Sequence, residues 1–244
     1  MRAWVFAVLA VLPCILELAE AGALPRIAII IDDLGYQQAA GERAIALPGP
    51  IACAILPGSP RATALAHAAR EQGKEILLHL PMQAANYHGK SESGSLTVDM
   101  THGELAESFN SALLTVPYAI GVNNHQGSLL TRHPGNMRWL MDEISLHAPM
   151  FFVDSFTTHE SVAVQIANEA GVRAVKRDVF LDSDPSPERV RQEFERLKAL
   201  ARLHGSAVAI GHPHDVTLAL LEELLPQLRE QGFALVPVSE LVAN

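Results

Sequence analysis

The feature that most constrains this chain is a regular alternation of short, continuously apolar segments with longer amphipathic ones. The apolar segments have the length and composition of parallel β-strands that are buried on both faces. We expect strands at Ile27–Ile31, Ile51–Ile55, Glu75–Leu78, Ala119–Val122, Met150–Val153, Arg173–Val175, Ala207–Ile210 and Ala234–Val236. Alternation with helices predicts an α/β fold with right-handed crossovers. We expect an irregular (β/α) barrel with seven or eight parallel strands, and an open doubly wound sheet is the alternative.

Capping residues and glycines mark several of the helices between these strands. We expect helices from Ser59-Pro60 to Gln72, from a capping box at Thr101 to about Leu114, from Ser186-Pro187 to His204, and from Asp215 to Gly232. The polar segment 84–98 predicts a loop long enough to suggest a function.

The N-terminus has the pattern of an export signal. Arg2 precedes an apolar run, Ala3–Leu16, and Ala19-Glu20-Ala21 is a small-x-small cleavage pattern. We therefore expect a signal peptide at 1–21, a single domain at 22–244, and a periplasmic or otherwise exported protein. The apolar run is short for a bilayer span, which needs roughly 20 residues, and this favours a cleaved signal peptide over the alternative, an uncleaved membrane anchor.

Composition excludes one class of partner. The chain carries 18 Lys and Arg against 27 Asp and Glu, and its net charge is −9. Nucleic acid requires a basic footprint, so we expect no nucleic-acid partner. Cys53 is the one cysteine left after cleavage, and its apolar neighbours predict a buried thiol without a disulfide.

Polar residues follow nearly every predicted strand. Because the carboxyl ends of parallel strands meet at one end of a barrel, these side chains are expected to form one site there. The groups are Asp32-Asp33, His79, Asn123-Asn124-His125, Asp154-Ser155, Arg177-Asp178 and His212-Pro213-His214.

The types of these residues favour a metal site. Two imidazoles and a carboxylate form an open ligand set for a catalytic divalent ion. Two adjacent carboxylates that leave a buried strand are tolerable if one ligates a metal and the other holds or shares a proton. The structural alternatives are a turn at Asp32-Asp33 and a core histidine with a hydrogen-bond partner at His79.

Several segments together resemble the divergent polysaccharide deacetylase family. They are Ile29-Ile30-Ile31-Asp32-Asp33-Leu34-Gly35, His79-Leu80-Pro81-Met82, Asn123-Asn124-His125-Gln126-Gly127-Ser128, Phe152-Val153-Asp154-Ser155 and Gly211-His212-Pro213-His214. The resemblance implies that Asp32 is the catalytic base and that Asp33 and His79 bind a divalent metal, with zinc expected. Classical members carry a second histidine four residues after the first, where this chain has Gln83. His125 is then the candidate for the third ligand.

The resemblance also implies metal-assisted removal of N- or O-acetyl groups from an envelope glycan. In that reaction His212, rather than His214, would protonate the leaving amine. Arg177 would hold Asp32 ionised, and Asp154 would orient a neighbour. Asn124, Ser155 and His214 are candidate substrate contacts. A non-catalytic protein that binds metal and glycan is the alternative, which Gln83 favours, whereas a two-lobed solute-binding protein fits poorly.

Overall fold

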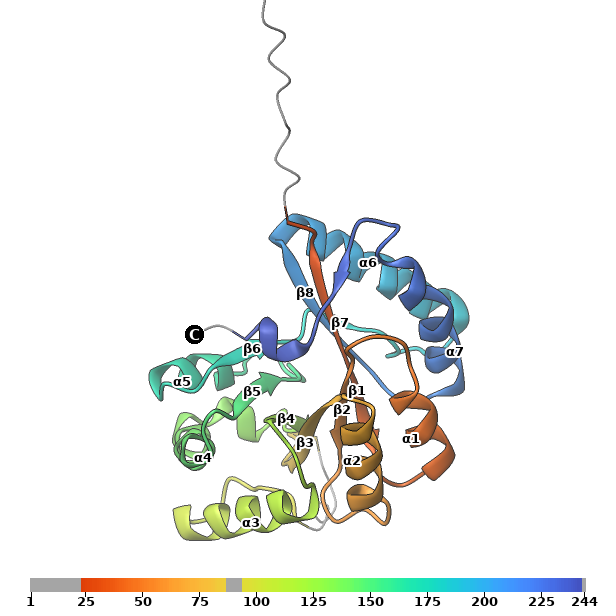
Figure 1. Ribbon diagram of the computed structural model, residues 1–244. Helices are drawn as coiled ribbons and strands as arrows, with labels where there is room; N and C mark the ends of the chain where they lie inside the picture. The colour runs from red at the N-terminus through yellow and green to blue at the C-terminus, as the bar shows by residue number, and fades with distance from the viewer. Residues whose placement is uncertain (1–22, 87–93, 243–244) are drawn as a thin grey trace, which may run out of the picture.

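Strand β1 (Arg26–Leu34) lies in the middle of a parallel sheet, between β2 and β8 (Figure 1). The computed structural model describes residues 23–86 and 94–242. Its strands follow the order β6-β5-β4-β3-β2-β1-β8-β7, and β9 pairs with the start of β1. Helices cover the outside of this sheet, which curls into a half-barrel. The predicted irregular (β/α) barrel of parallel strands is confirmed.

The elements have the following bounds. The other strands are β2 (Ala52–Ile55), β3 (Glu75–Met82), β4 (Gly121–Gln126), β5 (Phe151–Asp154), β6 (Ala174–Lys176), β7 (Val179–Phe180), β8 (Ser206–Gly211) and β9 (Ala234–Leu235). The helices are α1 (Gln38–Ile45), α2 (Ala62–Glu71), α3 (His102–Thr115), α4 (Pro134–Leu146), α5 (Ala163–Glu169), α6 (Pro187–His204) and α7 (Asp215–Leu224), with 3-10 turns η1 (Leu130–Arg132), η2 (Leu225–Gln227) and η3 (Val238–Glu240).

Alternate residues of the strands face two separate cores. In β1, Ile27, Ile29 and Ile31 pack against the helices, while Ala28 and Ile30 face the interior of the half-barrel. Residues on β2, β3, β5 and β8 complete the inner core, and Val238 and nearby C-terminal residues pack against it. This inner face carries the candidate site at its other end.

Three strands extend well beyond their apolar runs. β1 continues through Asp32-Asp33 to Leu34, β3 continues past His79 to Met82, and β4 continues beyond its predicted end at Val122 to Gln126. Pairing explains the extensions of β3 and β4, because these two strands stay in register as far as Met82 and Gln126. His79 is therefore a strand residue and not one that follows a strand.

The helix predictions are confirmed at Thr101 and Ser186 and wrong in detail at Ser59 and Gly232. Thr101 forms the predicted capping box with Glu104, and Pro187 begins α6. The Ser59 hydroxyl instead donates to the Leu56 carbonyl, 2.7 Å away, and α2 begins at Ala62. The last predicted helix ends early, at Leu224, since Pro226 lacks the amide hydrogen that an α-helix needs.

The two edges of the sheet are joined by a very short connection. β6 and β7 lie at opposite ends of the strand order, yet only Arg177 and Asp178 separate them, and no helix lies between them. Asp178 links to β8, because its amide donates to the Val208 carbonyl and its carboxylate accepts the Val208 amide. The two edges of the sheet therefore meet at a seam that the chain crosses without a helix of its own.

Cys53 is fully buried, as predicted, and is a free cysteine within the described residues. Within residues 23–86 and 94–242, no helix is both long and apolar enough to cross a bilayer. The predicted signal peptide and the middle of the predicted loop at 84–98 lie outside the described residues.

Candidate active site

The inner face of the sheet changes from apolar to polar at the carboxyl ends of its strands. Ala28 and Ile30 are followed on that face by Asp32, Leu77 by His79, and Val208 and Ile210 by His212, as two-residue periodicity requires. Asp32 and His79 are each only 2% exposed. The same strand faces that build the inner core therefore deliver ionisable groups to one buried site.

A break in strand geometry brings Asp33 to the same site. A regular strand would point adjacent residues to opposite faces. The register between β1 and β2 shifts after Ile31, and Asp33 has a φ of 57°. This left-handed conformation is unusual for a residue other than glycine and is typical of functional sites. It lets both carboxylates approach His79, at 3.6 Å for Asp32 and 3.1 Å for Asp33.

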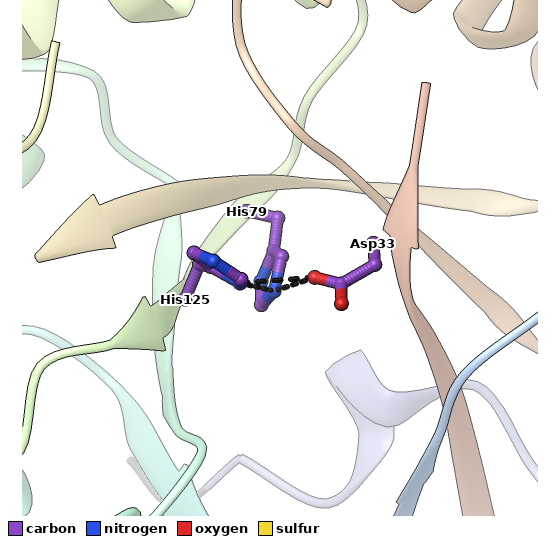
Figure 2. A group of neighbouring side chains, drawn as sticks. All are labelled: Asp33, His79 and His125. Atoms are coloured by element: carbon purple, nitrogen blue, oxygen red, sulfur yellow. Dashed lines mark hydrogen bonds and ion pairs between the residues drawn. The ribbon is translucent and has the colours of Figure 1, made fainter. Parts of the chain in front are cut away.

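Asp33, His79 and His125 converge from β1, β3 and β4 (Figure 2). Asp33 Oδ1 lies 3.1 Å from His79 Nε2 and 2.9 Å from His125 Nδ1, and the two ring nitrogens are 3.2 Å apart. The histidines share a strand face because His79 pairs with Asn123, two residues before His125. Three potential ligand atoms thus surround one small volume.

The hydrogen bond at the other side of the His79 ring supports a cation in that volume. His79 Nδ1 lies 2.9 Å from the Asn123 side-chain oxygen, and the Asn123 amide group donates to Asp32 Oδ1 at 2.8 Å. Nδ1 must therefore carry the proton, so in the neutral ring Nε2 presents a lone pair to Asp33. Asp33 Oδ1 is correspondingly buried without a well-oriented hydrogen bond. The His79 Nε2 lone pair and the Asp33 carboxylate oxygen repel each other unless a divalent cation lies between them or Nε2 gains a proton. One carboxylate and two imidazoles are a donor set that fits a divalent metal.

Without a metal, the electrostatics of the site favour an added proton on His79 and an ionised Asp33. Burial disfavours the carboxylate form of Asp33, but the contacts with His125 and His79 hold the pKa of Asp33 well below its usual range. Burial also opposes protonation of His79, yet Asp32 and Asp33 outweigh it and raise the His79 pKa. A metal ion that binds here would therefore displace protons.

The two aspartates differ in environment. Burial raises the pKa of Asp32 despite the opposing effects of His79, His212 and the Asn123 hydrogen bond. A carboxylate whose pKa is raised is suited to accept a proton near neutral pH, whereas one whose pKa is depressed is suited to remain an anion and bind a cation.

His212 is held by a second carboxylate. Its Nδ1 lies 2.9 Å from Asp182 Oδ1, and its backbone amide donates to Asp182 Oδ2. The Thr217 hydroxyl also donates to Asp182 Oδ2, at 2.7 Å. Burial opposes the charge on His212, but Asp182 and the site carboxylates raise the His212 pKa. With Nδ1 committed to Asp182, the free edge of the ring, Nε2, faces the site, 3.8 Å from Asp33 Oδ2.

Other predicted residues surround this centre with different partners. The Asn124 side-chain oxygen accepts the Ser155 amide, and its amide group donates to the Gln126 carbonyl. The hydroxyl of Ser155 accepts a 3.3 Å hydrogen bond from Asn123. His214 is exposed, precedes α7 without a side-chain cap, and has its ring 5.9 Å from that of His212.

Arg177 and Asp154 contact the chain after β5. Arg177 donates to the carbonyls of Ser155 and Phe156, so its hydrogen bonds do not go to Asp32. Asp154 accepts the Phe156 amide and the Ser161 hydroxyl, at 2.8 and 2.6 Å. Asp154 thus orients neighbouring residues, and Arg177 holds the same turn from its other side.

A cavity of about 350 Å³ opens beside the centre. Its walls include Asp33, His125 and His212 with apolar residues such as Leu34 and Leu56. Small-molecule sites combine an apolar lining with a few convergent polar groups in this way.

Sequence reasoning assigned no role to two central residues. Asn123 is fully buried and connects His79 to Asp32, and Asp182 positions His212. Asn123 lies inside a quoted motif, but only the register with His79 reveals its partners. Asp182 follows the short strand β7, which was not predicted; the apolar run Val179-Phe180-Leu181 is the signal that could have found it.

Gln83 has a structural task where classical members have a histidine ligand. Its side-chain oxygen accepts the Val98 amide at 2.9 Å, and its backbone bonds to Leu96. It therefore fixes the segment that follows β3, and His125 from the neighbouring strand completes the trio.

Similar proteins extend over nearly the whole described chain. An uncharacterized protein of Escherichia coli strain K12, YibQ, is 36% identical over 217 residues, which cover 89% of this chain and 67% of YibQ. The crystal structure of uncharacterized protein ATU2773 from Agrobacterium tumefaciens superposes with a TM-score of 0.86 at 21% identity and covers 91% of both chains.

Two more distant structures share the fold, each with a TM-score of 0.54 at 13% identity. Peptidoglycan deacetylase PdaC from Bacillus subtilis is covered over 90% of its chain, and 89% of this chain is covered. A BA3943 mutant, described as a CE4 family pseudoenzyme with restored enzymatic activity, is covered over 67%, again with 89% of this chain. The family model described as divergent polysaccharide deacetylase matches residues 29–242, and the chain belongs to that family.

Proposed function

We propose that this chain is an exported, metal-dependent carbohydrate deacetylase that hydrolyses N- or O-acetyl groups on an envelope glycan. Membership of the divergent polysaccharide deacetylase family implies a carbohydrate substrate. The observation that carries the proposal is the convergence of Asp33, His79 and His125, with Asp32 and His212 on either side. A base, a cation site and an acid in one buried centre are the parts that acyl hydrolysis requires.

Asp33, His79 and His125 would hold the metal, with zinc expected from two imidazoles and one carboxylate. A divalent cation there would supply Lewis acidity, which makes water more acidic and polarises an acyl carbonyl.

Asp32 accepts the proton of the attacking water in this proposal. Its raised pKa and its place beside the trio suit that task. His212 gives a proton from Nε2 to the leaving amine or alkoxide, while Asp182 stabilises the charged ring. The water oxygen forms the new bond to the acyl carbon, the bond to the amine or alkoxide breaks, and the products are acetate and the deacetylated sugar. One proton of the water goes to Asp32 and the other is lost when the acetic acid ionises, and transfer of the Asp32 proton to His212 through solvent restores both residues.

Acetate release from chitin oligomers and peptidoglycan fragments tests the reaction. Asp32→Asn preserves shape and should reduce turnover by about 10²-fold or more while zinc stays bound, as loss of a general base does. Asp33→Asn should lose zinc and turnover together. A fully active Asp32→Asn protein would reject the assigned base.

Zinc content tests the ligand set separately. His79→Ala and His125→Ala should each lose stoichiometric zinc in elemental analysis, because each removes one of three ligands. Stoichiometric zinc in both variants would contradict the site.

A non-catalytic protein that binds glycan and metal is the second candidate. Gln83 favours it, since its side chain is committed to Val98 and the classical ligand is therefore missing from the position directly after β3. Stoichiometric zinc and glycan binding without acetate release from any tested substrate would favour this candidate.

The proposal of export rests on three features in order: a basic residue at Arg2, the apolar run after it, and the cleavage pattern Ala19-Glu20-Ala21. N-terminal sequencing of protein from the envelope fraction should begin near Gly22. An intact Met1 in a soluble cytoplasmic fraction would contradict export.

A further inference from the structure

A second cavity, of about 860 Å³, lies at the seam between β6 and β7. We call it the seam groove. Its walls come from the turn after β5, the β6–β7 connection, the residues after β7, and one face of α6. The residues that line it include Phe156, Lys176, Arg177, Phe180 and Arg189.

The seam groove adjoins the candidate active site. The ring of Phe180 lies 5.0 Å from the ring of His212, and Leu181 directly precedes Asp182. Arg177 bonds to the carbonyl of Ser155, whose hydroxyl contacts Asn123. A ligand in the groove would therefore lie one side chain away from the proposed acid.

The groove is more basic than the protein as a whole. Four basic and three acidic residues line it, although acidic residues predominate in the chain. The acidic three are Asp178, Asp184 and Glu193. Glu193 pairs with Arg196, the Asp178 carboxylate accepts the Val208 amide, and Asp184 accepts the Ser186 amide.

Two cations in the groove are held over aromatic rings. Lys176 Nζ lies 4.7 Å from the centre of the Phe156 ring, and the Arg177 guanidinium lies 4.8 Å from that of Phe180. An aromatic ring orients a cation without cancelling its charge. Arg177 uses two of its five N–H groups for carbonyls, so the others remain suited to an anion. Among the described residues, no carboxylate forms an ion pair with Lys176, Arg177 or Arg189.

The wall that carries Phe156 is built into a strained conformation. Phe156 has a φ of 51°, a left-handed conformation that is strained for a residue other than glycine. Asp154 accepts its amide and Arg177 donates to its carbonyl, so both sides of the peptide backbone are fixed. Such strain persists only where the surroundings hold it, and here it presents an aromatic ring to the groove.

We propose that the seam groove binds acidic sugar units of the glycan, with Lys176, Arg177 and Arg189 around a carboxylate. A carboxylate fits better than a phosphate monoester, because the three acidic residues in the groove repel a doubly charged group more strongly. This inference rests on the proposed function for the identity of the ligand as a glycan, and it gives Asp154 and Arg177 the task of shaping the subsite.

Binding of two matched tetrasaccharides tests the proposal. Chitotetraose is neutral, and the alternating N-acetylglucosamine and N-acetylmuramic acid tetramer has a similar backbone with carboxylates. Zinc-loaded Asp32→Asn protein permits calorimetric titration without turnover. The acidic tetramer should bind about tenfold more tightly, as one charge-assisted contact allows, and 0.5 M salt should reduce the difference.

Charge reversals locate the binding site. In the same background, Lys176→Glu and Arg189→Glu should each remove the preference for the acidic tetramer. Arg229→Glu is the matched control, because Arg229 lines a separate cavity with Leu24 near the start of β1. It should keep the preference, and thermal melting should verify that all three variants fold.

Equal affinity for both tetramers, or equal losses in Lys176→Glu and Arg229→Glu, would overturn the subsite. The two proposals fail separately. Acetate release without a charge preference would leave the deacetylase and reject the subsite. If the preference for the acidic tetramer depends on Lys176 but the protein that retains Asp32 releases no acetate, the subsite stands and the deacetylase is rejected.

Discussion

Replacing Asn123 tests how the candidate centre is organised. Asn123 is fully buried, and its side chain accepts from His79 Nδ1 while it donates to Asp32 Oδ1 and, more weakly, to Ser155. Asn123→Ala leaves a donor on His79 and an acceptor on Asp32 without this partner. Each unsatisfied buried group costs about 1–3 kcal/mol, so the free energy of unfolding should fall by about 2–6 kcal/mol before any water enters.

The same change should weaken zinc binding by about 10–100-fold, as loss of a partner to a histidine ligand does. Asn123→Asp separates the two effects. Its carboxylate still accepts from His79 Nδ1, so zinc affinity should be retained. It adds a negative charge beside Asp32, where Asp33 already lies, so the free energy of unfolding should still fall. Asn136→Ala is the control for stability alone, because Asn136 is also buried but lies on α4 and contacts Val98.

Zinc affinity is measured by chelator competition, and unfolding of the metal-free protein by urea. Metal-free protein is required because bound zinc would itself add stability. Unchanged zinc affinity in Asn123→Ala would refute the argument that Asn123 fixes the tautomer of His79.

Three further predictions follow from the contacts of the site. Asp182→Asn should lower the pKa of His212. Because the proposed acid must be protonated, activity should be lost at lower pH than in the wild type, and an unmoved alkaline limb in the pH profile of kcat would contradict the role of Asp182. Zinc binding should release protons, and increasingly so as the pH falls, because His79 has a raised pKa without metal; calorimetric heats that are identical in buffers of different ionisation enthalpy would contradict this. Gly35→Ala should destabilise the protein by about 1–3 kcal/mol, since Gly35 has a φ of 132° and an added Cβ would overlap the Ser59 side chain. Gly103→Ala, where φ is ordinary and space is open, should not destabilise it in the same urea titration.

The sequence by itself determined the class of fold and the place of the site. Short runs rich in β-branched residues, such as Ile27–Ile31, favour buried parallel strands, and topology then brings the residues after them to one end of the barrel. The motifs around Asp33, His79 and His125 named the trio that the fold brings together, although their role as metal ligands stays a prediction.

Only the tertiary structure decided how these residues contact one another. The bulge that turns Asp33 to the inner face depends on the register between β1 and β2. The link through Asn123 depends on its pairing with His79, which lies 44 positions earlier in the chain. Asp182 was missed because β7 has two residues, too few for a periodic signal, and the short apolar run Val179-Phe180-Leu181 is the signal before it. Side-chain partners across strands are set by register and local backbone strain, and neither is encoded in the spacing of residues along one strand.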